Sequence, residues 1–224
     1  MDWEAILLTT RLALLTSITL LIIGLPIAYW LSFSTWRFKF LVEAIVALPL
    51  VLPPTVLGFY ILVAMGPKSP IGGLWEGLTG GHLVFSFGGL LVASVLYSLP
   101  FAVQSFASAF NSLDRHLIEA AWTLGASRLK TFFTIMIPLS LSGIITGVVL
   151  SFAHTMGEFG VVLMVGGNIP GVTRTASIDI YDKVQALDYA SAGKTALFLL
   201  IVSFATLSIV YGFNKRRIYG WPKR

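Results

Sequence analysis

The stretch of sequence that decides the fold runs from Glu119 to Pro138 and reads EAAWTLGASRLKTFFTIMIP, after a leader at residues 113–118. It has the character of a soluble surface helix, yet it lies between two apolar segments long enough to cross a bilayer. Asp114 is a suitable N-cap for this helix, and Gly125 is a suitable end. Apolar residues recur along it at three- and four-residue spacing, namely Leu113, Leu117, Ala120 or Ala121, and Leu124. A short capped amphipathic helix of this kind suits docking against another protein better than it suits catalysis.

The composition indicates an integral membrane protein. The chain of 224 residues is 56% hydrophobic and only 11% charged, whereas a soluble domain averages about 25% charged residues. The net charge of +5 comes from short loops and the tail, where the positive-inside effect accounts for it, so no nucleic-acid partner is expected. There is no cysteine, so we expect no disulfide, no thiolate chemistry and no cysteine-ligated metal. No cofactor and no metal site are predicted. The N-terminal residues lack the pattern of a cleaved signal, so the first apolar segment is expected to remain.

Five apolar segments predict an all-α protein with about five transmembrane helices, at residues 12–36, 44–67, 84–106, 131–153 and 195–214. The first contains Gly24 and Pro26, which a membrane helix tolerates when neighbouring groups satisfy the freed carbonyl. The apolar run at residues 159–165 is too short to cross, and residues 174–194 predict an ordered outer segment of short helices. No internal repeat separates these parts, so residues 1–224 are expected to form one membrane domain with a core at about residues 8–213.

The second apolar segment contains the run LPLVLPPT at residues 48–55. Three prolines within six residues do not fit a regular helix, because each removes an amide donor and a proline clashes with the preceding turn. One interpretation is a short loop between a cytoplasmic half-helix and a true span that starts near Pro54. The other is a break that lines a pathway. In both cases Pro53, Pro54 and Thr55 are expected to face protein and not lipid.

Polar side chains interrupt the third and fourth segments. Ser94, Ser98 and Gln104 are placed to hydrogen-bond across helices. The small residues of the fourth segment favour close contact with another helix or with a second copy of the chain (Ser140, Ser142, Gly143, Thr146 and Gly147). That segment ends at His154 and Glu158, which are four residues apart and have the chemistry of a proton relay. A polar patch at the outer mouth of the bundle is the simpler interpretation, and we favour it.

Charge asymmetry orients the chain in the membrane. Ten of the fifteen Lys and Arg residues lie in residues 36–39, in the amphipathic loop and in the tail, and the other five are spread over the N-terminus and two longer loops. The basic side of a plasma-membrane protein faces the cytoplasm. Five spans then place the N-terminus outside and the C-terminus inside.

Conventional catalytic motifs are absent from the sequence. No glycine-rich loop with a following lysine could bind ATP, and no nucleophile-elbow pattern surrounds a serine. His82, His116 and His154 are too far apart in sequence to resemble a zinc motif. The chain is therefore not expected to be an enzyme, and any energy from ATP must come from a partner.

The opening stretch resembles the EAA loop of ABC importer permeases. The match comprises Glu119, Ala120, Ala121, Gly125, Ile135 and Pro138 at the family's spacing, with Ile137 in place of the usual leucine before the proline. In that family the loop forms the coupling helix, which rests in a groove of the ATP-binding subunit. The small side chains of Ala120 and Ala121 would let a partner surface approach closely. The resemblance implies a type I ABC importer permease fold.

Two further segments resemble molybdate permeases in particular. One is the proline-rich run followed by Gly58, and the other is GEFG at residues 157–160 followed by NIPG and TRT. Related permeases often carry arginine where this chain has His154. Sulfate permeases share the second motif, usually as GEYG, and are commonly longer, and tungstate permeases are closer still.

The resemblance implies a permease subunit of an ATP-driven molybdate importer in a bacterial or archaeal cell membrane, with tungstate or sulfate as the alternative cargo. A proton-coupled secondary transporter is the less favoured class. The implied partners are two ATP-binding subunits, an extracytoplasmic molybdate-binding protein and a second copy of the chain. The matched residues of the EAA loop are assigned to coupling. For the pathway or its gate we predict Pro53, Pro54, Thr55 and Glu158.

Overall fold

The computed structural model describes the backbone of residues 1–219 and the side chains of residues 1–212. The basic tail predicted from the sequence (Lys215, Arg216, Arg217, Lys223 and Arg224) lies outside the residues whose side chains are described. Within the described part the chain forms α-helices and one π-helical segment, with no strand. The prediction of an all-α membrane protein is confirmed.

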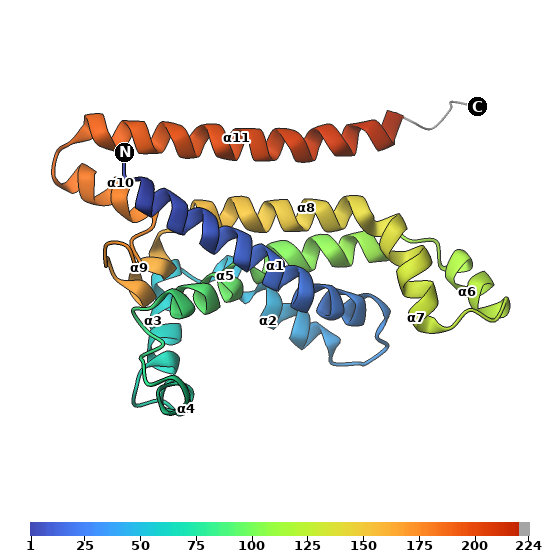
Figure 1. The fold of residues 1–224 in the computed structure, drawn as a ribbon. Helices are drawn as coiled ribbons and strands as arrows, with labels where there is room; N and C mark the ends of the chain where they lie inside the picture. The colour runs from blue at the N-terminus through green and yellow to red at the C-terminus, as the bar shows by residue number, and fades with distance from the viewer. Residues whose placement is uncertain (220–224) are drawn as a thin grey trace.

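Three long helices form the centre of the bundle, α1 (Trp3–Phe33), α5 (Phe87–Asn111) and α8 (Ile137–Met156) (Figure 1). Phe106 of α5 is fully buried in the apolar core that they share. Small residues bring the backbones close, since a Cβ added to Gly143 would lie 2.4 Å from the Cβ of Ala109. A side chain at Gly147 would likewise meet the Phe106 ring at 2.6 Å. The predicted small-residue face of the fourth segment therefore packs on α5 of the same chain.

Helix α11 (Tyr189–Tyr219) lies alongside α8 at the margin of the bundle (Figure 1). Its apolar side chains are largely exposed, with Leu200 at 64% and Phe204 at 72%, as expected of a helix that faces lipid or another chain. By length and hydropathy, α1, α5, α11 and the segment Arg128–Met156 can each cross a membrane. A fifth crossing exists if the bent pair described below counts as one span.

The first helix begins at Trp3 and not at residue 12 as predicted. The Asp2 carboxylate caps it by accepting the Ala5 N–H at 3.1 Å. The prediction started the span after Arg11, but the helix continues through that residue, whose guanidinium stacks over the Phe87 ring at 4.7 Å from its centroid.

The second apolar segment is bent. Helix α2 (Lys39–Val51) and helix α3 (Pro54–Met65) meet at an angle of 114°. Pro54 begins α3, where its missing N–H costs no hydrogen bond, and Pro53 is held extended by the proline after it. Pro49 does lie inside α2, so two of the three prolines produce the break. Since α3 has only 12 residues, the interpretation of a true span starting near Pro54 is wrong.

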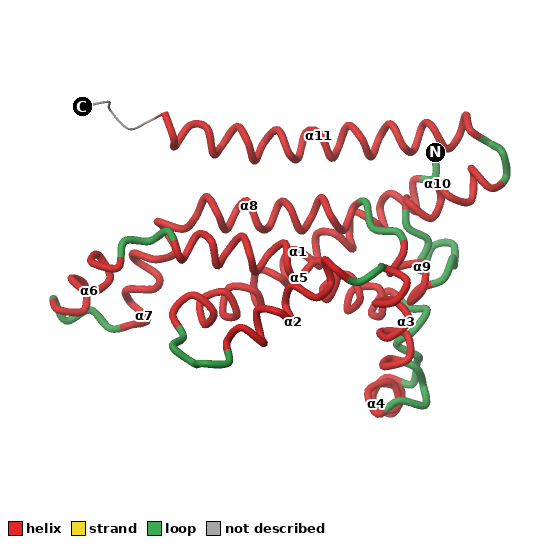
Figure 2. Tube along the Cα trace, turned by 180° about the vertical axis from the view of Figure 1, so that it is seen from behind, coloured by secondary structure: helices red, strands yellow, loops and turns green. Residues whose placement is uncertain are grey.

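The remaining short helices lie at the two ends of the bundle. Helix α4 (Pro70–Thr79) follows α3, and α9 (Gly160–Gly166) and α10 (Ala176–Gln185) lie near the N-terminus (Figure 1). Helices α6 (Arg115–Thr123) and α7 (Arg128–Thr131) lie at the opposite end, as the view from behind also shows (Figure 2). The Thr9 hydroxyl accepts the Ala176 N–H at 2.8 Å and fixes α10 to α1. The segment 174–194 is thus ordered, as predicted.

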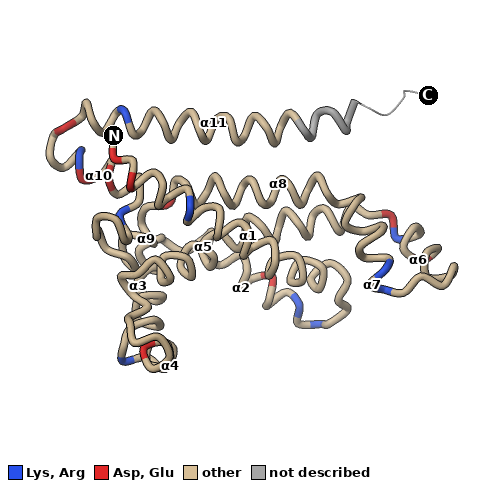
Figure 3. Tube along the Cα trace, in the orientation of Figure 1, with Lys and Arg blue, Asp and Glu red and all other residues tan. Residues whose placement is uncertain are grey.

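Charge is distributed unequally between these ends (Figure 3). Asp and Glu gather near the N-terminus and α10, whereas Lys and Arg occur at both ends, among them the segment at α7 and the start of α2. The ten Lys and Arg residues from which the sequence predicted the cytoplasmic side are divided between the end at α6 and the C-terminal tail, whose side chains lie outside the described part, so the orientation stays a prediction.

Candidate functional site

Helix α6 (Arg115–Thr123) is the predicted amphipathic helix, and it is capped at both ends as predicted. The Asp114 carboxylate accepts a backbone N–H of the first turn at 2.9 Å. At the other end Gly125 takes a φ of +83°, and the Ala126 N–H donates to the Ala121 carbonyl at 3.0 Å. This bond belongs to a Schellman motif, in which glycine is favoured because its backbone turns left-handed without strain.

Almost all side chains of α6 are at least partly exposed on the surface of the single chain. Ile118 is its one buried residue, 3% exposed, and joins the apolar core of the bundle. The Glu119 side chain is 65% exposed, and Leu117 and Leu124 of the predicted apolar stripe are 49% and 88% exposed. An exposed apolar stripe beside an acidic side chain is a surface suited to docking another protein.

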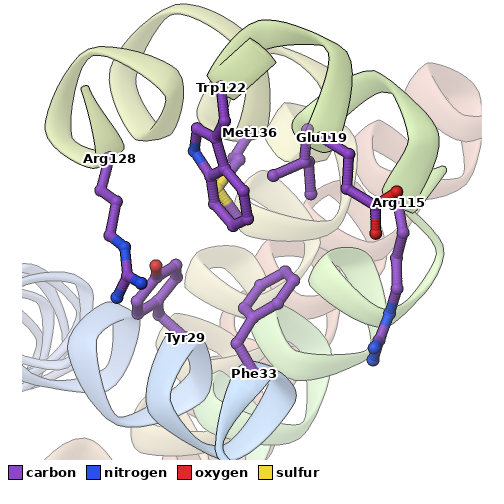
Figure 4. A pocket seen from close by; sticks show the side chains of 8 residues that line it. Tyr29, Phe33, Arg115, Glu119, Trp122, Arg128 and Met136 are labelled. Carbon is purple, nitrogen blue, oxygen red and sulfur yellow. The ribbon is translucent and has the colours of Figure 1, made fainter. Parts of the chain in front are cut away.

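A pocket of about 250 Å³ separates α6 from the inner ends of α1 and α8 (Figure 4). Trp122 and Met136 point into it from the side of α6 and the π-helical segment, and Tyr29 and Phe33 face them from α1 (Figure 4). Arg128 lies over the Trp122 ring at 5.8 Å from its centroid. Helix α6 thus rests on the bundle through Ile118 beside a partly polar pocket.

Two residues of the predicted coupling set lie apart from α6. Ile135 is in the π-helical segment Phe132–Met136, and Pro138 is in the first turn of α8. Proline has no N–H and its ring clashes with the carbonyl four residues before it. The wider π turn relieves that clash. Ile135 and Pro138 therefore belong to the junction through which the chain enters α8. The other predicted coupling residues, Glu119, Ala120, Ala121 and Gly125, lie on α6 or in the turn that ends it.

The structure brings two of the predicted pathway segments together. Pro53, Pro54 and Thr55 are exposed in the single chain, so the expectation that they face protein and not lipid is not met there and stays a prediction for the assembled transporter. A Cβ added to Gly160 would lie 2.7 Å from the Cβ of Pro54, and Gly160 begins α9 two residues after Glu158. The break in the second segment therefore lies against the break between α8 and α9.

Polar side chains connect α5 to the end of α8, as predicted for Ser98. Its hydroxyl lies 2.9 Å from His154 Nδ1 and 3.0 Å from the Thr155 hydroxyl. The His154 ring is also stacked on Phe101, with centroids 4.2 Å apart. Among the described residues no hydrogen bond joins His154 to Glu158, because α8 ends at Met156. The geometry of a direct proton relay between the two is thus absent from this arrangement.

Glu158 is 4% exposed, and neither of its carboxylate oxygens has a hydrogen-bond partner in the described part of the chain. The Ser94 hydroxyl is a neighbouring polar group of this carboxyl, and it too has no hydrogen-bond partner in the described part of the chain. A buried ionised carboxylate without a partner is strongly disfavoured. Glu158 is therefore not a simple structural anchor, and a proton, a water molecule or a moving element must complete its surroundings.

A groove of about 480 Å³ runs between the inner halves of α5 and α8. Most of its lining side chains are hydroxyls or amides, namely Gln104, Ser105, Ser108, Ser112, Ser140, Ser142 and Thr146. The α8 members and Gln104 were singled out from the sequence as polar or small residues, but Ser105, Ser108 and Ser112 were not. Their three- and four-residue spacing was the signal that could have identified them. Such a lining can solvate an anion weakly, without a fixed charge that would hold it.

A membrane-embedded bundle that offers an exposed, doubly capped helix at its basic end has the design of a transport subunit driven by another protein. The chain belongs to the family of binding-protein-dependent transport system inner membrane components, whose profile matches residues 13–219. This makes it a multi-pass inner-membrane protein that works with a binding protein and an ATPase, and it is not itself an enzyme.

Three curated relatives are informative. The chain is 53% identical over 214 residues to "Molybdenum transport system permease protein ModB" of Azotobacter vinelandii, covering 96% of this chain and 95% of that protein. It is 37% identical to the protein of the same name in Escherichia coli, covering 93% and 91%. It is 33% identical to "Probable sulfate transport system permease protein cysT" of Chlorella vulgaris, covering 94% of this chain but 79% of that protein.

Solved structures share the fold. A bacterial alginate ABC transporter aligns with a TM-score of 0.76 at 16% identity, covering 96% of this chain and 79% of that chain. The MetNI methionine ABC transporter in an inward-facing conformation aligns with a TM-score of 0.72 at 17% identity, covering 94% and 95%. The predicted resemblance to type I ABC importer permeases is confirmed at the level of fold.

Proposed function

We propose that this chain is the permease subunit of an ATP-driven importer for molybdate. The observation that carries the cargo is the 53% identity, over nearly all of both chains, to a permease named for molybdenum transport. The observation that carries the mechanism is the exposed, capped helix α6, on which an ATP-binding subunit can dock. Sulfate is the alternative cargo, because a relative named for sulfate transport is 33% identical. Tungstate is a further alternative, since it is also a tetrahedral oxyanion.

In the proposed complex two copies of the chain form the pathway, with the N-terminus outside and the C-terminus in the cytoplasm. Residues 1–224 act as one membrane domain. Two ATP-binding subunits dock on the two α6 helices through Glu119, Ala120 and Ala121, with Gly125 turning the chain away. A molybdate-binding protein delivers the anion at the opposite side, where α10 and the ordered segment before it lie.

ATP binding closes the two motor subunits and draws the α6 helices together. The motion passes through Ile118 and the π-helical segment into α5 and α8, and it opens the pathway outward. The break at Pro53, Pro54 and Thr55 moves against Gly160 and forms part of the gate, with Glu158 beside it. The groove lined by serines between α5 and α8 forms the inner part of the route. ATP hydrolysis resets the cycle.

The experiment is uptake into proteoliposomes that contain the chain with its ATPase and binding protein. ATP-dependent uptake of molybdate, competed by tungstate and not by sulfate, is the expected result. Sulfate uptake with molybdate excluded would contradict the proposed cargo while leaving the class intact. The class is tested separately by co-purification, because an importer permease should retain its ATPase in detergent and lose part of it on substitution at Gly125.

A further inference from the structure

The outer end of α1 borders a groove for which the proposed transport cycle has no use. It has a volume of about 480 Å³ and is lined by Glu4, Leu7, Leu8, Arg11, Phe87, Gly171 and Val172. One acidic and one basic side chain therefore share an otherwise apolar groove, and both are on the same helix. A mostly apolar groove with a few placed polar groups has the general make-up of a ligand site.

Arg11 is the first feature that points to a ligand. It is exposed, and after Glu4 it is the only charged residue of α1. Its guanidinium is held over the Phe87 ring at 4.7 Å from the centroid. Neither Arg11 nor Glu4 forms an ion pair within the described part of the chain. An exposed guanidinium near the membrane end of a helix, with no counter-ion in the described chain, is free to bind an anion.

The face of α1 on which Arg11 lies is the second feature. Leu7, Leu14, Ile18 and Ile22 occupy the same helical face at three- and four-residue steps, and they are 66%, 51%, 53% and 66% exposed. An exposed stripe of leucine and isoleucine on a membrane-spanning helix faces acyl chains. The anion beside Arg11 therefore approaches from the lipid and carries an apolar tail.

Glu4 adds a preference for the headgroup. It precedes Arg11 by two helical turns, about 10 Å toward the aqueous end of the helix. In a zwitterionic phospholipid the amine likewise lies further from the acyl chains than the phosphate. We propose that this groove binds the headgroup of a phospholipid with a primary amine, with the phosphate at Arg11, the ammonium group toward Glu4 and an acyl chain along the stripe.

Native mass spectrometry of the intact importer complex, stripped of lipid and titrated with phosphatidylethanolamine in detergent, tests the proposal. Arg11→Gln should weaken lipid binding about tenfold, the effect of losing a charge-assisted hydrogen bond. Arg37→Gln is the matched control, because Arg37 stacks on Phe38 at 4.8 Å in the same way but lies outside the groove. It should change binding less than about twofold, the spread typical of a surface substitution.

A second variant keeps the test decisive if Arg11→Gln does not fold. Glu4→Gln, at an exposed position, should remove the preference for phosphatidylethanolamine over phosphatidylglycerol and leave phosphate binding intact. Equal weakening by Arg37→Gln, or no loss of preference in Glu4→Gln, would overturn the proposal.

Two other outcomes would reassign the groove. Displacement of the lipid by inorganic phosphate or molybdate would make it a site for free oxyanions. Disulfide cross-linking of Leu7→Cys to a second copy, with no lipid bound, would make it an interface between copies. The lipid readout does not depend on the cargo, so it stands or fails independently of the proposed function.

Discussion

Replacement of Ile118 by alanine tests whether α6 is mechanically linked to the membrane bundle. Ile118 is 3% exposed and is the only residue of α6 in the apolar core. Truncating a buried isoleucine costs about 2–5 kcal/mol, depending on how far the site can relax. Since the pocket of about 250 Å³ already adjoins this side chain, water can enter and the lower half of that range applies, about 2–3 kcal/mol.

The loss should be local, because no other side chain of α6 is buried in the bundle. A cost of about 2–3 kcal/mol raises the population of undocked α6 by about 30- to 150-fold. Hydrogen exchange should therefore quicken at the Leu124 and Ala126 amides, which are bonded within α6 and its cap, and stay unchanged in α5. ATP-driven uptake should fall while ATP hydrolysis persists.

Leu117→Ala is the control for this prediction, because Leu117 is on the same helix and 49% exposed. It should leave the exchange of the α6 amides unchanged. Unchanged exchange in Ile118→Ala, or faster exchange spread evenly through α5 and α8, would refute the reasoning that Ile118 is the link.

Three further substitutions address the cap, the gate and the buried carboxyl. Gly125→Ala forces a side chain into a φ of +83° and should cost about 1–2 kcal/mol, seen as lower ATPase retention on co-purification; full retention would contradict the capping role. Gly160→Ala places a Cβ 2.7 Å from Pro54 and should slow uptake. Gly157→Ala is the control, because its nearest neighbour is at 3.8 Å, and it should not slow uptake. Equal uptake rates in both variants would argue against a gate at Pro54 and Gly160. Glu158→Gln keeps the shape and removes the charge, so the unfolding temperature should not fall, because the ionised form is the one that burial disfavours. A clear fall in thermal melting would show that the charge of Glu158 has a stabilising partner.

The sequence was sufficient for the features that depend on local chemistry. The capping of α6 by Asp114 and Gly125 was predictable because each acts within a few residues of itself. The number of apolar segments and the direction of the charge asymmetry were predictable for the same reason, since both follow from composition along the chain.

Features that depend on distant contacts were not predictable. The angle of 114° between α2 and α3 is set by packing on α9, where a side chain at Gly58 would meet Met164 at 2.8 Å. The proline run predicted a break in the second apolar segment but not the direction in which the chain bends. The early start of α1 was missed because Arg11 was taken as a boundary, whereas Phe87 from another helix accommodates it.

The central claim is that α6 couples a separate ATPase to transport. It is tested most directly by measuring ATP hydrolysis and molybdate uptake together in proteoliposomes carrying Glu119→Lys. The Glu119 side chain is 65% exposed, so the variant should fold and insert normally, and Glu76→Lys at the outer side is the matched control, with its side chain 44% exposed. We expect Glu119→Lys to hydrolyse ATP without uptake and Glu76→Lys to transport normally. Normal molybdate uptake per ATP in Glu119→Lys would contradict the account.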